Sequence, residues 1–473
     1  MRRLRFAVAA APLLAFASLV ALAQESGSPT DRGPREPDSP NLRPSSKVTG
    51  DRLKRYDEAI AAFKAAEAKL GKEGYTAARK DLENAVRLWK NLRSEDLGEP
   101  LPLYYLGMLD QLVRNDRQAK ANLKLCVQMA PKFHEAWTEL GDTHSHLNEF
   151  PDSDAAYSKA LEIKPDYLGA LRNRALERLT AGRYQESRED VKKGLAIAKN
   201  DPELHAIELK LQLAIEGPKW SLKFEKETEN YVIKTNVDQV LADMFAQKAE
   251  LIRKLYVAWF DQTFKSHPKL PKRKYPIIIF ADTKEYHSFF PGMDMAGGHY
   301  DPAIRQLFFF KYQNPDDGWA VLFHEAFHQF LHPYLESAAP DWFNEGLGDY
   351  FGGAKHVKVP EEHMQIAPFN WRLGLAKQLI NSGQARPLEQ LLRLMHNQFY
   401  DPATMGQNYA EGWSFVYFLC QYENQKYFPL VSRYFAACHE GKDLDEAFKA
   451  AFGKEDMKKI DQEWRDYIKS LEK

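Results

Sequence analysis

The sequence predicts a multidomain protein in which an all-α solenoid of helical repeats precedes a domain of the α+β class. Three observations support this fold class. A period of about 34 residues runs through positions 49–216. From residue 220 this period gives way to short apolar runs that are typical of strands, and from about residue 319 helical patterns return. We therefore expect a second domain at 220–473, with a sheet subdomain at 220–318 and a helical subdomain at 319–473.

The N-terminus has the pattern of an export signal. A basic start, MRRLR, precedes a long apolar run, and Ala21-Leu22-Ala23 fits a cleavage site formed by small residues. We therefore expect residues 1–23 to be a signal peptide and the protein to be exported by a bacterium, either to the periplasm or out of the cell. An uncleaved membrane anchor is the alternative, because the apolar run is nearly long enough to span a bilayer. After cleavage, no stable membrane span is expected.

Residues 24–48 and the overall composition narrow the class of protein further. This segment is rich in proline, serine and charged residues, which predicts a disordered linker. The formal net charge of the chain is −1, which gives no general attraction to nucleic acid. The chain has 3 cysteines, which are too few for a disulfide framework, although Cys420 and Cys438 could pair.

The repeats at 49–216 are defined by positions that recur once in every period. Pro131 and Pro165 are separated by one full period, and each lies just before an aromatic residue. Small residues recur at the same spacing, where they would let paired helices approach closely. An earlier hairpin around Gly74 and Tyr75 supplies a fourth, weaker copy. The unit at 134–167 shows the pattern best, with Trp137, Leu140, Gly141, Tyr157, Ala160 and Pro165 at the expected places.

This pattern resembles the tetratricopeptide repeat, whose period is about 34 residues. At least three such repeats are needed to bury a continuous core, and the chain meets that number. The resemblance implies a solenoid of helical hairpins that binds a protein partner, with the first helix of each hairpin lining a peptide groove. A generic array of helical hairpins is the alternative.

The second domain is predicted to begin with strands and one long helix. The runs NYVIKT and YPIIIFA are typical of strands, and an amphipathic helix from about Val237 to Phe264 separates them. A third strand is predicted at RQLFFFKY, with Gly297 and Gly298 marking the turn before it. From there to the C-terminus we expect helices.

A buried helix with two histidines follows these strands. It contains HEAFH, which runs from His324 to His328, and Pro333 is expected to end it. Residues four apart share a face of a helix, so the two histidines point together. Two buried imidazoles need polar partners, and a metal ion would satisfy both. Glu325 lies about 100° further round the helix, which is where a base for water activated by the metal belongs.

A second helical motif, PDWFNEGLGDYFGG, supplies acidic residues at the same spacing. HEAFH alone could be a pair of core histidines with a salt-bridged glutamate. However, a catalytic zinc site needs three protein ligands and one open position, and Glu345 can be the third ligand. Asp349 lies one turn further on and can accept the outward N–H of a ligand histidine. The two motifs therefore predict Zn²⁺ bound by His324, His328 and Glu345.

Together the motifs resemble the gluzincin metallopeptidases, which carry HExxH on one helix and Asn-Glu-x-x-x-Asp on the next. Over about residues 220–420, the chain also resembles peptidase-MA-like bacterial proteins of unknown function. It implies a zincin-like metallopeptidase domain that hydrolyses a peptide or protein substrate, with Glu325 as the base. Aminopeptidase members carry Gly-x-Met-Glu-Asn upstream, where this chain reads GMDMAGGHY. An endopeptidase is therefore expected.

The resemblance also implies an oxyanion donor from the helical tail, for which Tyr409 is the candidate and a core tyrosine the alternative. His332 is expected to be a core residue or a neighbour of the ligands.

Two functions other than peptide hydrolysis remain possible for this sequence. One is a catalytically silent peptidase-like scaffold, and the other is a peptide-binding protein that acts through its repeats and holds zinc only structurally. Glu325 favours the enzyme, because a silent protein need not keep the base.

Overall fold

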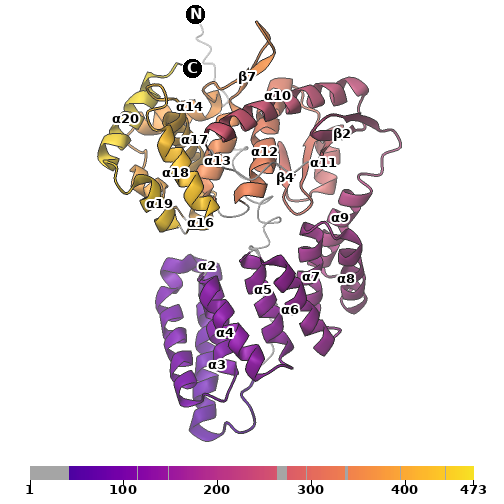
Figure 1. Ribbon diagram of the computed structural model, residues 1–473, viewed down its shortest axis with the longest axis vertical. Coiled ribbons are helices and arrows are strands. Elements are labelled where there is room, and N and C mark those ends of the chain that lie inside the picture. Colours follow the sequence, from indigo (N-terminus) through magenta and orange to yellow (C-terminus); the bar gives the residue numbers. More distant parts are fainter. Residues whose placement is uncertain are drawn as a thin grey trace, which may run out of the picture. The chain divides into compact units, whose positions relative to one another are not determined.

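The computed structural model shows a chain that divides into two compact units, and the sequence passes from one to the other between Lys219 and Trp220 (Figure 1). Within the described residues, no helix has both the length and the apolar character needed to cross a membrane. The predicted signal peptide and most of the predicted linker lie outside these residues. The structure describes residues 42–113, 115–147, 149–263, 274–293, 296–335, 339–394, 396–442 and 444–472.

The first unit is an all-α solenoid in which consecutive helices pack as antiparallel hairpins, which confirms the predicted fold class for this part of the chain (Figure 1). Its buried apolar residues include two clusters, one from Val48 to Leu140 and one from Ala160 to Leu171, and the partly buried Trp137 packs against both. The helices are α2 (Gly50–Glu95), α3 (Leu101–Leu112), α4 (Asp116–Met129), α5 (His134–His146), α6 (Phe150–Ile163), α7 (Leu168–Thr180), α8 (Tyr184–Ile197) and α9 (Pro202–Ile215).

The segment labelled α2 doubles back on itself. Lys69 and Asp81 form an ion pair at 2.8 Å, and Arg55 and Glu95 form another at 2.7 Å. A straight helix rises about 1.5 Å per residue, so residues 40 positions apart in the sequence could not meet on it. The two halves of α2 therefore make a hairpin, where the sequence predicts a fourth and weaker copy of the repeat.

Glycines at the recurring small positions let the paired helices touch. A Cβ atom at Gly141 in α5 would lie 2.6 Å from ring carbon Cε1 of Tyr157 in α6. A Cβ atom at Gly107 in α3 would lie 2.6 Å from Cγ of Leu123 in α4. Both separations are far below van der Waals contact, so any larger residue would push the hairpin apart.

The end of the predicted linker is ordered on the first unit, contrary to the prediction of disorder up to residue 48. Val48 is buried in the interior that the α2 hairpin forms, and the N–H of Ser45 donates to the carboxylate of Glu99 at 3.0 Å. Apolar contacts of Leu42 and Val48, an ion pair between Arg43 and Asp57 and this hydrogen bond anchor residues 42–48 at the start of the solenoid. Composition averages over a segment and does not record such individual contacts.

The second unit begins with a mixed α/β part. Its described strands form a five-stranded sheet in the order β1-β2-β3-β5-β4, with parallel pairs at the centre and antiparallel pairs at both edges. Alternate residues of β5 point to opposite faces: Phe309 packs against Phe245 of α10, and Phe310 against Tyr286 of α11. The elements are β1 (Phe224–Glu227), β2 (Tyr231–Thr235), α10 (Gln239–Thr263), β3 (Tyr275–Phe280), α11 (Thr283–Phe289), β4 (Gly298–Asp301) and β5 (Gln306–Phe310).

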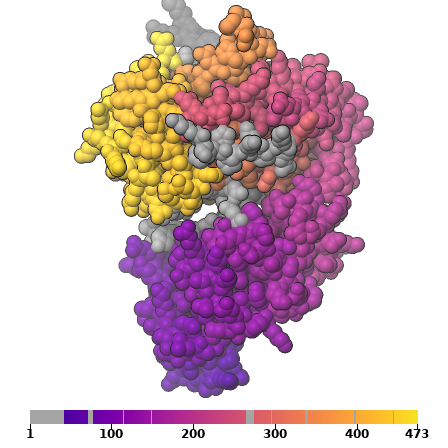
Figure 2. All heavy atoms as spheres, viewed as in Figure 1, coloured from indigo at the N-terminus to yellow at the C-terminus, as the bar shows by residue number. Residues whose placement is uncertain are grey.

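Helices dominate the rest of the second unit and share one hydrophobic core with the sheet. One β-hairpin, β6–β7, interrupts them and projects from the surface (orange, Figure 2). The elements are α12 (Pro315–Leu335), α13 (Asp341–Gly352), β6 (Lys355–Val357), β7 (His363–Gln365), α14 (Asn370–Asn381), α15 (Leu388–Leu391), α16 (His396–Phe399), α17 (Met405–Gln421), α18 (Phe428–His439), α19 (Leu444–Phe452) and α20 (Met457–Ser470).

Three local predictions for this unit are wrong. Gly298 lies within strand β4 and not in a turn, because a Cβ atom there would lie 2.3 Å from Phe309 and only glycine allows the strands to pair. The β6–β7 hairpin falls in the part predicted to be helical, where its strands of 3 residues are too short to show a period. Helix α12 continues past Pro333, because Tyr334 and Leu335 are buried and hold the last turn.

Candidate metal centre

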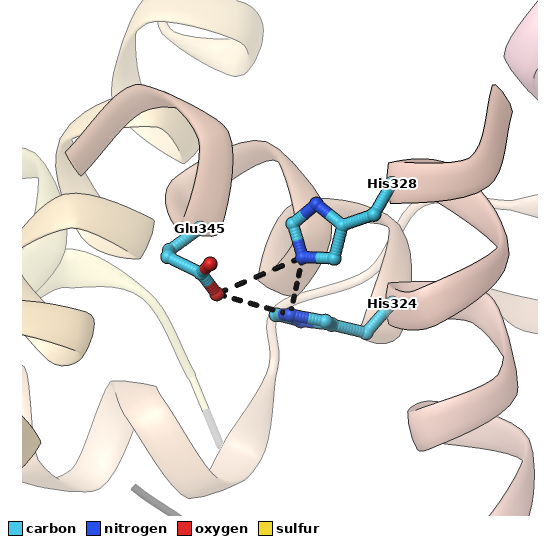
Figure 3. Close-up of side chains that lie close together, drawn as sticks. All are labelled: His324, His328 and Glu345. Atoms are coloured by element: carbon cyan, nitrogen blue, oxygen red, sulfur yellow. Dashed lines mark hydrogen bonds and ion pairs between the residues drawn. The ribbon is translucent and has the colours of Figure 1, made fainter. Parts of the chain in front are cut away.

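Two helices bring the predicted ligands together. His324 and His328 lie on α12 and Glu345 lies on α13, and all three side chains are buried and point at a common centre (Figure 3). The Nε2 atoms of the two histidines are 2.9 Å apart. Oε2 of Glu345 is 3.2 Å from Nε2 of His324 and 3.7 Å from Nε2 of His328.

Each imidazole is oriented through its other nitrogen. Nδ1 of His324 lies 3.0 Å from Oδ1 of Asp349, and Nδ1 of His328 lies 3.1 Å from Oδ1 of Asn344. In the tautomer that donates both of these hydrogen bonds, the Nε2 lone pairs face the centre. Gly348 makes room for this arrangement, since a Cβ atom there would lie 2.8 Å from Cε1 of His324.

The donor set fits a zinc ion. Zinc binds nitrogen and oxygen ligands at about 2.0–2.2 Å in a tetrahedron, so two such ligands are about 3.4 Å apart. The three separations here are 2.9, 3.2 and 3.7 Å, and they bracket that value. Three acceptor atoms that face one another in a buried site repel unless a cation lies between them. His324, His328 and Glu345 are therefore suited to hold a metal ion.

The pKa values of His324 and Glu345 also indicate that positive charge is favoured at this site. Although burial lowers the pKa of His324, the hydrogen bonds to Asp349 and Glu345 raise it to about 10. Burial also disfavours the charged form of Glu345, yet the charges of His328 and His324 hold its pKa well below the usual value. In the metal-free protein, a bound proton therefore partly balances the carboxylates.

Glu325 lies beside this centre and is not one of the converging ligands. Its Oε2 accepts the backbone N–H of Tyr300 at 3.0 Å, which ties it to the edge strand β4. Burial raises the pKa of Glu325, although the nearby charges of His324 and His328 oppose the rise. The carboxylate is thus fixed in direction and shares a pocket with His324.

The pocket beside the ligands also has an aromatic wall. Tyr409 of α17 stands in it beneath the guanidinium of Arg372, which lies 4.7 Å from the ring centre. Burial and the charges of Glu345 and Asp349 raise the pKa of Tyr409 well above its usual value. Among the described residues, its hydroxyl makes no hydrogen bond of full geometry, although a weak hydrogen bond to Glu345 also raises its pKa. The lining residues are Ala320, Val321, His324, Glu325, Asp349, Phe369, Trp371, Arg372 and Tyr409.

Several residues of the site are missing from the sequence prediction. Asn344 precedes Glu345 in the second motif, so the sequence could have identified it as a residue of the site. Arg372 donates from Nε to Oδ2 of Asp349 at 2.5 Å, and Tyr400 donates its hydroxyl to Oε1 of Glu345 at 2.9 Å. No sequence signal marks these two, because each reaches the site from a distant segment.

The remaining predicted residues lie away from the ligand centre. The ring of His332 packs edge-on against that of Tyr300, with centroids 5.7 Å apart. Burial, assisted by the charge of Arg305, lowers the pKa of His332 to about 4. Cys420 and Cys438 are separate buried thiols and do not form the disulfide that the sequence left open.

Two family models match the chain, one in each unit. A tetratricopeptide-repeat family matches residues 134–167, and a family described as "Protein of unknown function (DUF1570)" matches residues 319–436, which include His324, His328 and Glu345. No curated protein matches the chain.

Two of the solved structures that resemble the chain match it over about a third of its length. A thermophilic tetratricopeptide-repeat protein of Thermus thermophilus is 17% identical, with 34% of this chain and 84% of that chain covered and a TM-score of 0.29. A structure of MamA is 19% identical, with 32% and 94% covered and a TM-score of 0.26. The family matches therefore lie in both units: a tetratricopeptide-repeat family in the all-α solenoid and a family of unknown function in the second unit, over residues 319–436.

Proposed function

We propose that the second unit is a zinc-dependent peptidase of the gluzincin type, more specifically an endopeptidase, which acts after export from a bacterial cytoplasm. One observation carries the proposal: the ligand atoms of His324, His328 and Glu345 converge beside the carboxylate of Glu325. The resemblance of the two sequence motifs to gluzincins supports it, as does the export pattern at the N-terminus.

The roles of the residues follow from their positions. His324, His328 and Glu345 would hold the ion, and zinc bound there supplies an acidified water molecule and a polarised substrate carbonyl. Glu325 takes a proton from the attacking water at its carboxylate and returns it to the leaving amine. The N–H of Tyr300 keeps that carboxylate aimed into the pocket during both transfers.

Metal analysis and peptide digestion together test this proposal. The mature protein should contain about one zinc per chain. It should cleave members of a peptide library at internal bonds, lose that activity with a chelator, and regain it when zinc is restored. Stoichiometric zinc without cleavage of any peptide would instead favour the silent scaffold or the structural zinc site.

Tyr409 is proposed to donate a hydrogen bond to the oxyanion that forms on the substrate. Its hydroxyl is buried in the pocket and makes no hydrogen bond of full geometry among the described residues, so it is free to turn from its weak contact with Glu345 to a substrate oxygen. Tyr409→Phe should lower kcat by about 10²-fold or more, with zinc content unchanged. Turnover equal to that of the wild type would show that Tyr409 is only a core tyrosine.

The tetratricopeptide repeats indicate protein–protein interaction, and we propose that they recruit a partner or the substrate. Residues 49–216 expressed alone should then be helical by circular dichroism, unfold cooperatively and retain a protein from a periplasmic extract. A Gly141→Leu fragment is the matched control, because its side chain would collide with Tyr157 and open the hairpin. Independent recruitment is wrong if the wild-type fragment is unfolded or retains nothing beyond this control.

A further inference from the structure

The two carboxylate oxygens of Glu345 have different partners. Oε2 faces the histidines, 3.2 Å from Nε2 of His324, whereas Oε1 accepts the hydroxyl of Tyr400 at 2.9 Å. Both side chains are buried, with Glu345 0% and Tyr400 7% exposed. A buried hydroxyl on one oxygen fixes the rotation of the carboxylate and presents the other oxygen to the centre.

Tyr400 is itself held in place, because the short helix α16 before it is anchored at both ends. Nδ1 of His396 pairs with Oδ1 of Asp341 at 3.1 Å. The side-chain amide of Asn408, which is fully buried, donates at 2.6 Å to the carbonyl of the residue before Tyr400. His396 and Tyr400 are four residues apart, as are Asp341 and Glu345. Two matched pairs therefore join this segment to α13.

A second tyrosine, Tyr409, also lies near Glu345 and can be compared with Tyr400. The rings of Tyr400 and Tyr409 are 6.3 Å apart, both are buried, and the charge of Glu345 acts on both phenols. The hydroxyl of Tyr400 donates to Oε1 of Glu345 at 2.9 Å, whereas the hydroxyl of Tyr409 approaches the same carboxylate, which raises its pKa, without reaching full hydrogen-bond geometry. The role of Tyr400 at Glu345 can therefore be tested separately from the role proposed for Tyr409 at the substrate.

We propose that Tyr400 is a positioning residue for the metal centre: its hydrogen bond to Oε1 holds Glu345 so that Oε2 is offered to the ion, and this sets the affinity for zinc. Tyr400 touches neither the ion nor the substrate. The inference rests on the proposed zinc function and adds a residue that governs how tightly the metal is held.

The test compares the zinc affinities of full-length Tyr400→Phe, Tyr409→Phe and wild-type proteins by competition with a chromophoric chelator. Loss of a hydrogen bond to a ligand typically weakens metal binding by about 10- to 100-fold, and this is the expected result for Tyr400→Phe. Tyr409→Phe should bind zinc as the wild type does. The melting temperature of metal-free Tyr400→Phe should fall by only about 2–4 °C, so the loss of affinity cannot be attributed to unfolding.

The possible outcomes show whether the positioning role of Tyr400 or the proposed zinc function is wrong. If the wild type binds no zinc, the proposed function fails first. If the wild type binds zinc and Tyr400→Phe binds it equally well, or if both tyrosine variants lose affinity alike, the positioning role is overturned and the zinc function stands. Should Tyr400→Phe not fold, His396→Ala replaces it, because that side chain is 47% exposed. It should weaken zinc binding by about 10-fold, and wild-type affinity would overturn the positioning role.

Discussion

Glu325→Gln is expected to keep its zinc and to lose about 10²- to 10⁴-fold in peptide hydrolysis. The amide matches the carboxylate in size, and its oxygen can still accept the N–H of Tyr300, which lies 3.0 Å from Oε2 in the wild type. It cannot take up a proton, however, so the attacking water loses its base. Zinc should stay because Glu325 is not one of the three converging ligands.

The measurements are zinc content by atomic spectroscopy and kcat on a peptide that the wild type cleaves. Glu411→Gln is a matched control, since Glu411 is also a buried glutamate but pairs with Arg386 at 2.9 Å and does not line the pocket. Its kcat should stay near that of the wild type. Parallel loss of zinc and activity in Glu325→Gln would make Glu325 a ligand or a structural residue, and full activity would exclude it as the base.

The sequence could predict the parts of the site that lie within single helices. Residues four apart on a helix share a face whatever the rest of the protein does. This local rule places His324 with His328 and Glu345 with Asp349. The structure brings the two pairs together, with Asp349 3.0 Å from His324. The helical repeats were predictable for the same reason, because each hairpin contacts mainly its neighbours in the sequence.

Contacts between distant segments could not be predicted in this way. Tyr400 reaches Glu345 across 55 positions of the sequence, and Arg372 reaches Asp349 across 23. Such pairings depend on how the chain folds back, and no period or spacing records that path. The hairpin β6–β7 and the edge strand β4 were missed because their strands, of 3 or 4 residues, are set by pairing and not by an alternating pattern.

Glu345→Ala is expected to abolish tight zinc binding, whereas His332→Ala should retain it. His332 lies eight residues after His324 on the same helix, about 12 Å along its axis, which is too far for one ion whose ligands lie about 2 Å away. In the structure its ring instead packs against Tyr300. Glu345 comes from α13 and reaches within 3.2 Å of Nε2 of His324.

The expected loss of zinc affinity in Glu345→Ala follows from the part of the binding free energy that one ligand contributes. Four-ligand zinc sites bind with about 10–16 kcal/mol, or about 2.5–4 kcal/mol per ligand, so Glu345→Ala should raise the Kd by about 10²- to 10³-fold. Both variants truncate a largely buried side chain, so melting of the metal-free proteins shows whether either one is unfolded. Metal content and Kd then decide between the residues. If His332→Ala loses zinc and Glu345→Ala keeps it, the third ligand belongs to α12 and not to α13.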